Sequence, residues 1–384
     1  MFEESKIYSK EIGGLDSIRA FAFFAVFLFH VEFLTCGYMG VQAFFVLSGF
    51  LLTRILVDMK ADLKGSKFFF RFYGRRALRI FPLYYLYLLV AGIAAYLFIE
   101  KFGETNYPAL TIFWKEYVYL ATYTINFFTA SVHYQPSFYA GHLWSLAVEE
   151  QFYLVWPFII YFVSNRRLKL VLLFIIILGP LARLAEALAL YYQIPSNLSN
   201  NINLVVYALP FSYFDAFAMG GFFSLFKVRT TKRQFWLFVC FVPMIGYMTQ
   251  WLSSGAITSW RALGYPNFMQ DSFKYLWGYS LWSILFCLLI QRVVQGDFFP
   301  RIFNNPTLRY LGKISYGLYV FHLPVIAMML RIGRGVPTKL IGFFALLVTT
   351  LISIVSYELM EKRFIRLKEI LAPKNDIPIK RLHG

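Results

Sequence analysis

The sequence is poor in charged residues, which make up only 15% of its 384 positions, against roughly a quarter in a soluble globular domain. Acidic residues are the scarcer sign: 20 Asp and Glu stand against 37 Lys and Arg, for a formal net charge of +17. Hydrophobic residues reach 59%, and the mean hydropathy is +0.58. These values exclude a soluble domain and predict a polytopic membrane protein. We expect no nucleic-acid partner, because the positive charges lie between apolar runs, where the positive-inside rule places them.

Cysteine is also rare, and the three cysteines are scattered at Cys36, Cys240 and Cys287. No CxxC motif or Cys/His cluster is present, so we expect neither a metal site nor a disulfide framework. Internal repeats and low-complexity tracts are missing as well. The first apolar run has no small-residue cleavage site, which predicts a retained anchor rather than a cleaved signal.

The apolar stretches predict an all-α integral membrane protein with about ten transmembrane helices in one bundle. Each stretch is near the roughly 20 residues that a span requires. In chain order they cover about 15–35, 40–58, 80–99, 142–163, 168–190, 204–226, 234–252, 272–294, 310–330 and 338–360. The Lys and Arg residues assigned to the two membrane faces, those at the ends of spans included, divide 27 to 6 in favour of the N-terminal side. This bias predicts that both termini are cytoplasmic.

The predicted organisation has three parts: a cytoplasmic N-terminal segment (1–14), a transmembrane domain (15–361) and a basic cytoplasmic tail (362–384). Within the domain, residues 68–79 are aromatic and basic, which is typical of an interfacial helix on the cytoplasmic face. The longest exterior loop covers 103–141, and its middle, about 111–128, is expected to form an amphipathic helix on the outer surface.

The first apolar run, LDSIRAFAFFAVFLFH, contains Asp16, Arg19 and His30. An ionisable side chain inside hydrocarbon is costly unless it has a partner or reaches water, so such residues indicate function. Arg19 and His30 are eleven residues apart, which is roughly 16 Å along a helix. One helix therefore places a cation near one membrane face and an imidazole well towards the other.

Counting residues from the helix ends places His30 at the same depth as Glu149 and Glu150, in the outer half of the bilayer. Adjacent residues of a helix point about 100° apart, so at most one glutamate is expected to face His30. A carboxylate that orients an imidazole is the usual arrangement for a general base acting on a hydroxyl. The alternative is a buried His–Glu pair that only locks two helices together.

Four arginines are predicted to converge at the cytoplasmic surface: Arg19, Arg75, Arg76 and Arg79. Arg76 and Arg79 share a helix face, as do Arg75 and Arg79. Clustered guanidiniums suit phosphate, whose oxygens they bind bidentately. The alternatives are anionic lipid headgroups and the general positive-inside bias, while Asp16 could pair with Arg19.

Four further polar residues lie within predicted spans and could support a site: Ser48, Asp215, Tyr316 and His322. Asp215 and His322 fall near mid-span. We expect each of these to be a satisfied packing or gating group. Gly220 and Gly221 are expected to permit close helix approach.

Several of these strings together resemble the acyltransferase 3 family. The strings are LDSIRAFAFFAVFLFH, GYMGVQAFFVLSGFLLTRIL, FYGRRALRIFPLYYLYLL, HLWSLAVEEQFYLVWP, FDAFAMGG and LGKISYGLYVFHLP, in the family's order. The family consists of integral-membrane acyltransferases, typically bacterial, that decorate surface glycans. The resemblance implies a multi-pass inner-membrane enzyme that moves an acyl group from cytoplasmic acyl-CoA to an extracytoplasmic hydroxyl.

The resemblance also implies roles for individual residues. The family's motif positions correspond here to Arg19, His30, Ser48, Arg76, Arg79, Glu149 and Glu150. The co-substrate implied is acyl-CoA, with acetyl-CoA the family-level expectation, and the acceptor is a saccharide or lipid-linked glycan among membrane lipids. Some relatives carry a C-terminal esterase-like domain. This chain ends about 24 residues after its last predicted span, so we expect no such domain.

Two mechanisms remain open for an O-acyltransferase. His30 either deprotonates the acceptor hydroxyl or takes the acyl group itself. Ser48 is a weaker candidate carrier, because no base is evident beside it. The alternative function is a proton-coupled transporter or flippase of a glycan or lipid-linked substrate, with His30 and Glu149 as a proton relay. The lack of inverted-repeat symmetry disfavours it.

Overall fold

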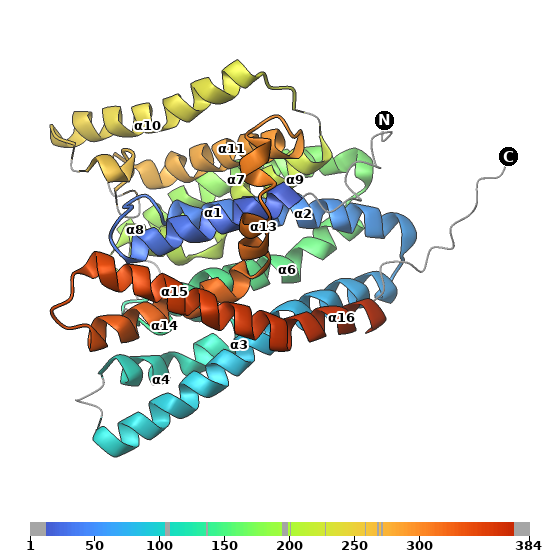
Figure 1. The fold of residues 1–384 in the computed structure, drawn as a ribbon. Coiled ribbons are helices and arrows are strands. Elements are labelled where there is room, and N and C mark those ends of the chain that lie inside the picture. The colour runs from blue at the N-terminus through green and yellow to red at the C-terminus, as the bar shows by residue number, and fades with distance from the viewer. Residues whose placement is uncertain are drawn as a thin grey trace.

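The computed structural model describes residues 13–103, 108–135, 137–193, 199, 201–226, 228–257, 259–266, 269 and 272–371 (Figure 1). Throughout these ranges the regular structure is helical, and no β-strand forms. The predicted N-terminal segment and the end of the predicted tail lie almost wholly outside the described residues. The first part of the tail, 362–371, is helical.

The helices and their bounds are α1 (Gly13–His30), α2 (Met39–Asp62), α3 (Ser66–Phe102), α4 (Pro108–Ala121), α5 (Ile125–Thr129), η2 (Gly141–Leu143), α6 (Trp144–Phe162), α7 (Asn165–Tyr191), α8 (Ile202–Ala208), η3 (Pro210–Tyr213), α9 (Phe214–Leu225), α10 (Lys232–Ser254), η4 (Trp260–Ala262), α11 (Lys274–Val294), α12 (Pro300–Phe303), α13 (Pro306–Lys313), α14 (Ser315–Ile332), α15 (Thr338–Ser356), the π-helical turn η6 (Tyr357–Glu361) and α16 (Lys362–Leu371). Each of the ten predicted stretches is mainly helical.

Within the described residues, seven helices are long and apolar enough to cross a membrane. The number rises to eight if α8 and the η3–α9 segment, bent by 68°, form one span. This agrees with an integral membrane helical protein. The count of ten stays a prediction, because α1 and α6 are not among the seven. Both carry polar side chains in otherwise apolar helices, and those side chains prove to be the ones that form the site.

Helix α3 differs from the prediction. Residues 68–79 do not form a separate interfacial helix, because α3 continues unbroken from Ser66 through Pro82 to Phe102. Its 37 residues correspond to roughly 55 Å, well beyond the roughly 30 Å of hydrocarbon that a span crosses. No helix-breaking residue lies between Arg79 and Phe81, so the basic segment 68–79 and the span that follows it form one helix.

The predicted exterior loop contains two helices rather than one. Helix α4 runs alongside the second half of α3 (Figure 1), and Tyr84 Oη donates a hydrogen bond of 2.9 Å to Leu120 O. The chain breaks at Thr122–Thr124 before α5 begins. This loop therefore folds against the bundle.

Helices α2 and α9 make a close backbone contact. A Cβ added at Gly49 would lie 2.1 Å from Phe217 O, and one added at Gly220 would lie 2.0 Å from Val46 O. The two backbones meet because neither glycine has a side chain, as is typical of small-residue helix contacts in membranes. This confirms the expected close approach at Gly220. It also turns Ser48, next to Gly49, away from α9.

Helix α1 runs through the middle of the bundle (Figure 1), where it contacts α2, α11 and α14. Its first turn is held by Ser17, whose Oγ donates a hydrogen bond of 2.6 Å to Phe303 O. Most of its apolar side chains are buried, including Phe23 and Phe27. This buried helix carries Arg19 near its start and His30 at its end.

Candidate active site

The first polar cavity, which we call the arginine cavity, has a volume of about 260 Å³ and lies among α1, α2, α3, α6 and α14. It collects most of the site residues predicted from the sequence. Its polar lining residues are Arg19, Ser48, Arg76, Arg79, Ser145, Glu149, Glu150, Tyr153, Ser315, Tyr316 and Tyr319. Positive and negative side chains therefore face one small volume inside the bundle.

Glu149 is the best-connected carboxylate of this cavity. It accepts hydrogen bonds from Ser48 Oγ and from Tyr153 Oη. Tyr153 follows Glu149 by one helical turn on α6, so the two side chains share a face. The expectation that no base lies beside Ser48 is wrong: its hydroxyl is bonded to a carboxylate.

The arginines come together largely as predicted. Arg76 lies over the ring of Tyr153, with its guanidinium carbon 5.5 Å from the ring centroid. Arg19 pairs with Asp16, which was one of the expected alternatives. Arg75 is not among the cavity's lining residues. It is rotated about 100° from Arg76 on α3, so its predicted place in the cluster stays a prediction.

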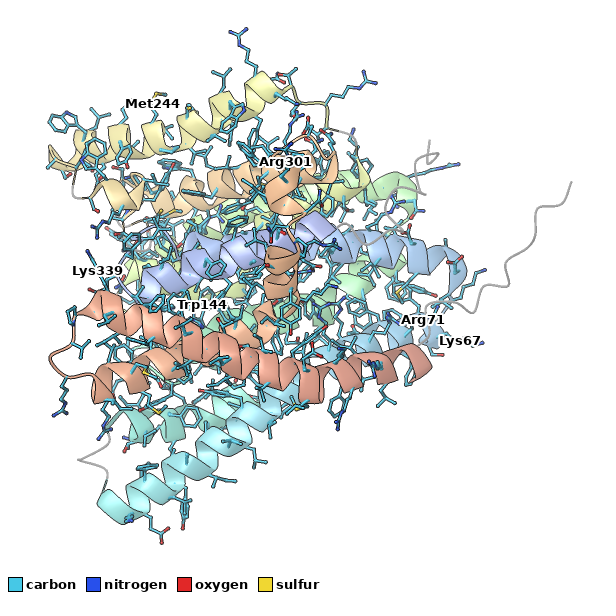
Figure 2. The ribbon with its side chains drawn as sticks, viewed as in Figure 1. Lys67, Arg71, Trp144, Met244, Arg301 and Lys339 are labelled. Carbon is cyan, nitrogen blue, oxygen red and sulfur yellow. The ribbon has the colours of Figure 1, made fainter. Side chains whose placement is uncertain are left out.

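The second cavity, which we call the histidine cavity, has a volume of about 280 Å³. His30 and His142 line it, together with Tyr38, Trp144, Tyr207 and other aromatic side chains. One wall comes from the predicted exterior loop, with Thr129, Tyr134, Ser137, Phe138 and Gly141. Figure 2 shows Trp144 inside the bundle, away from the basic end marked by Lys67 and Arg71.

Three histidines meet at this cavity. The ring centroids of His30 and His322 are 5.1 Å apart, and those of His322 and His142 are 4.8 Å apart. His142 Nε2 lies 3.1 Å from Val320 O, and His322 Nδ1 lies 2.6 Å from Tyr319 O. Because a carbonyl oxygen only accepts, both nitrogens must carry the proton.

The predicted contact between His30 and a glutamate is not formed. His30 lines the histidine cavity, whereas Glu149 and Glu150 line the arginine cavity. The depth count assumed that His30 lies a turn inside its helix, but α1 ends at His30. The residue level with it is His142, in η2 directly before α6, and the glutamates lie about two turns further along, roughly 10 Å away.

The two cavities lie back to back. Val41 and Tyr319 line both of them. The Tyr319 hydroxyl is held at 2.6 Å from Ser145 Oγ and at 3.1 Å from His142 O. A single layer of side chains, which we call the Tyr319 partition, therefore separates the arginines from the histidines.

The remaining predicted support residues fall in different places. Tyr316 lines the arginine cavity and donates a hydrogen bond of 2.9 Å to Ile80 O. His322 stands beside His30. Asp215 is remote from both cavities and forms a buried pair with Arg183, at 2.9 Å between Nη2 and Oδ2. The expectation of a satisfied packing group is correct for Asp215.

The sequence reasoning missed His142 and Tyr319. His142 opens the HLWSLAVEEQ string, and a signal for its partner was present in Pro324. A proline inside a helix has no N–H for the carbonyl four residues before it. That carbonyl belongs to Val320 and receives the His142 ring instead. Pairing a proline-freed carbonyl with a nearby histidine donor would have placed His142.

A third cavity, of about 810 Å³, is lined mainly by apolar side chains and lies on the flank of the bundle. Exposed side chains such as Phe127, Leu154 and Phe211 border it, and it meets the arginine cavity at Arg76 and Glu150. Its lining suits hydrocarbon chains rather than polar reactants. In the part of the chain that is described, no group of three or more His, Cys, Asp or Glu side chains is arranged to hold a metal ion.

Fold and site together define a helical membrane protein with an arginine-lined cavity and a histidine-bearing cavity on either side of a thin partition. The model of the acyltransferase 3 family, described as an acyltransferase domain, matches residues 12–358. The chain belongs to this family.

Two relatives illustrate the likeness. The chain is 27% identical to "Putative peptidoglycan O-acetyltransferase YrhL" of Bacillus subtilis (strain 168), over 92% of this chain and 55% of that protein. It is 26% identical to "O-acetyltransferase OatA" of Staphylococcus aureus (strain NCTC 8325 / PS 47), over 93% of this chain and 58% of that protein. The chain thus spans little more than half the length of these relatives. No solved structure matches it.

Proposed function

We propose that this protein is a membrane O-acetyltransferase that moves an acetyl group from cytoplasmic acetyl-CoA to a hydroxyl of an extracytoplasmic saccharide. One observation carries the proposal: α1 contributes Arg19 to the arginine cavity and His30 to the histidine cavity. Membership of an acyltransferase family supports the chemistry. Peptidoglycan is the first acceptor to test, because one relative's name contains it.

The arginine cavity would receive the donor. Coenzyme A carries phosphates at one end and the thioester at the other end of a long arm. Arg19, Arg76 and Arg79 would hold the phosphates by charge-assisted hydrogen bonds. At about 260 Å³ the cavity suits the arm rather than the whole nucleotide. The nucleotide would therefore stay at the mouth of the cavity while the thioester reaches the Tyr319 partition.

The two glutamates take a different role from the one predicted. Glu149 is bonded to Ser48 and Tyr153 on the donor side, so it would position the arm and offset the arginine charges. Glu150 lines the same cavity. A carboxylate is a suitable acceptor for the amide N–H groups of the arm. In this scheme Glu149 and Glu150 act in donor binding, and neither acts on His30.

The histidine cavity would receive the acceptor. His30 would remove the proton from the acceptor hydroxyl as that oxygen attacks the thioester carbon. The carbon–sulfur bond then breaks, the acetyl ester forms, and the proton held by His30 passes to the sulfur to give free CoA. The aromatic walls offer apolar faces to a sugar ring. A volume of about 280 Å³, small for a ligand site, fits one sugar unit at a time.

The proposed direction of transfer follows from charge. Lys67 and Arg71 mark one end of the bundle and Lys339 the other (Figure 2). The 27 to 6 distribution of Lys and Arg favours the Lys67 end as cytoplasmic. The arginine cavity lies towards the start of α1 and the histidine cavity towards its end. We place the protein in the bacterial inner membrane.

The experiment compares O-acetylation of envelope glycan in cells that carry wild-type protein, His30→Ala or His133→Ala. His133 is exposed and lies outside both cavities, so it serves as the matched histidine control. We expect His30→Ala to abolish the acetyl mass increment at normal protein abundance, and His133→Ala to retain it. Full acetylation in the His30→Ala strain would overturn the proposal.

A further inference from the structure

We propose that His322 is the positioning residue of His30, in the place where the sequence predicted a glutamate. This inference rests on the proposed function, because it assigns the group that prepares His30 to act as a base. The relay has three members in order: the Tyr319 carbonyl, the His322 ring and the His30 ring. A neutral imidazole would take the role that a carboxylate has in the better-known hydroxyl-activating triads.

The backbone fixes the tautomer of His322. Its Nδ1 lies 2.6 Å from Tyr319 O, which can only accept, so Nδ1 carries the proton. In the neutral ring the lone pair is then on Nε2. This nitrogen is buried and has no hydrogen-bond partner among the described residues. A buried acceptor without a donor requires an explanation.

The donor that fits is His30. Its ring centroid is 5.1 Å from that of His322, and facing ring atoms at this separation come near hydrogen-bond reach. No other side chain in the described part of the chain is a hydrogen-bond partner of the His322 Nε2. A small rotation of His30 would direct one of its N–H groups at this lone pair. The other nitrogen of His30 would then be unprotonated and face the cavity, as a base requires.

The His322 ring cannot easily turn away from this position. It is fully buried, its ring centroid lies 5.8 Å from that of Phe23 at an interplanar angle of 88°, and it lies 5.3 Å from the Tyr319 ring. Phe23 comes from α1, two turns before His30. A group that orients a base must itself be held by packing. His322 meets that condition, whereas His30 is only half-buried and free to meet a substrate.

His142 resembles His322 in its hydrogen bonding. Its Nε2 is bound to Val320 O, and its Nδ1 is buried and has no partner among the described residues. His142, however, lines the histidine cavity, and His322 does not. We therefore assign His142 to the acceptor: its lone pair would receive a second saccharide hydroxyl. The two residues should respond differently to substitution.

The test uses the full chain in proteoliposomes, with radiolabelled acetyl-CoA as donor and N-acetylglucosaminyl-N-acetylmuramic acid as soluble acceptor. His322→Asn keeps a donor for Tyr319 O but has no group where Nε2 was. His322→Gln places an amide oxygen near Nε2, where it can accept from His30. We expect His322→Asn to lower kcat on the order of 100-fold, with KM for acetyl-CoA unchanged, and His322→Gln to recover most of that loss.

His142→Gln and His133→Gln complete the set. We expect His142→Gln to raise KM for the disaccharide more than it lowers kcat, and His133→Gln to match wild type. Equal losses in His322→Asn and His322→Gln, or a wild-type kcat in His322→Asn, would overturn the inference. If wild type itself transfers no acetyl group, the proposed function fails. If His30→Ala is inactive while His322→Asn is normal, only the positioning role fails.

Discussion

The buried pair of Arg183 and Asp215 allows a stability prediction with a worked magnitude. Both side chains are fully inaccessible, on α7 and α9, and two parallel contacts of 3.2 and 2.9 Å join them. Ser280 completes the arrangement, because it accepts from Arg183 at 2.6 Å and donates to Asp215 at 2.5 Å. Replacing Asp215 by Asn removes one charge without changing the shape.

The expected cost follows from what is left behind. In Asp215→Asn the guanidinium of Arg183 keeps the carbonyls of Ser212 and Leu276, at 2.5 and 3.0 Å, but loses its counter-charge. Breaking a buried ion pair by removing one partner costs about 3–5 kcal/mol. Replacing both partners by apolar residues is often nearly neutral. We therefore expect Arg183→Met/Asp215→Leu to be more stable than Asp215→Asn.

Wild type and the variants are purified in the same detergent, and the free energy of unfolding of each is measured by denaturant titration. Asp58→Asn is the matched control, because the Asp58 side chain is 59% exposed in its pair with Arg54. An exposed pair contributes about 0–1 kcal/mol. If Asp215→Asn unfolds within about 1 kcal/mol of the Asp58→Asn control, the uncompensated-charge reasoning is refuted.

Two further predictions concern the arginine cavity, as the donor site of the proposed function, and the predicted exterior loop. Arg76→Gln and Arg79→Gln should each raise KM for acetyl-CoA roughly tenfold or more, because each removes one charge-assisted hydrogen bond. Arg75→Gln should stay near wild type. Steady-state kinetics in proteoliposomes check this, and an equal rise of KM in Arg75→Gln would contradict it. Burial raises the pKa of Glu116, on α4 outside the candidate spans, from 4.5 to about 8. A carboxyl group whose pKa is higher in the folded state destabilises the fold as pH rises through that window. Glu116→Gln should therefore have a higher free energy of unfolding than wild type at pH near 8 and an equal one at pH near 4.5. No difference at the higher pH would argue against a buried neutral carboxyl.

The arginine cavity was largely predictable because its logic is local. Arg76 and Arg79 are three residues apart on a helix, and that spacing alone puts them on one face. Arg19 follows from the cost of a charge in an apolar run. Arg75 and Arg76 point about 100° apart on the helix, and the sequence does not say which of the two turns towards the cavity with Arg79.

The histidine cavity was not predictable by counting depth. Counting assumes straight helices that end where hydrophobicity ends, yet α1 stops at His30, before Val31 and Phe33. Three segments far apart in sequence, around His30, His142 and His322, then meet through tertiary packing. Only the Val320 carbonyl, left without an N–H partner by Pro324, offered a local signal. The bond between Ser48 and Glu149 likewise joins two segments, α2 and α6, that meet only through tertiary packing.

The Tyr319 partition has a consequence for the membrane as an insulator. A bacterial inner membrane stores energy as a voltage worth about 2.3 kcal/mol per elementary charge at 100 mV. An open path from the arginines to the histidines would dissipate it. The side chains of Val41 and Tyr319, with Ser145 bonded to the Tyr319 hydroxyl, close that path. Under the proposed function, the acceptor oxygen and the thioester carbon meet at this partition. A two-carbon acyl group is small enough to be transferred there while ions and water stay on their own sides.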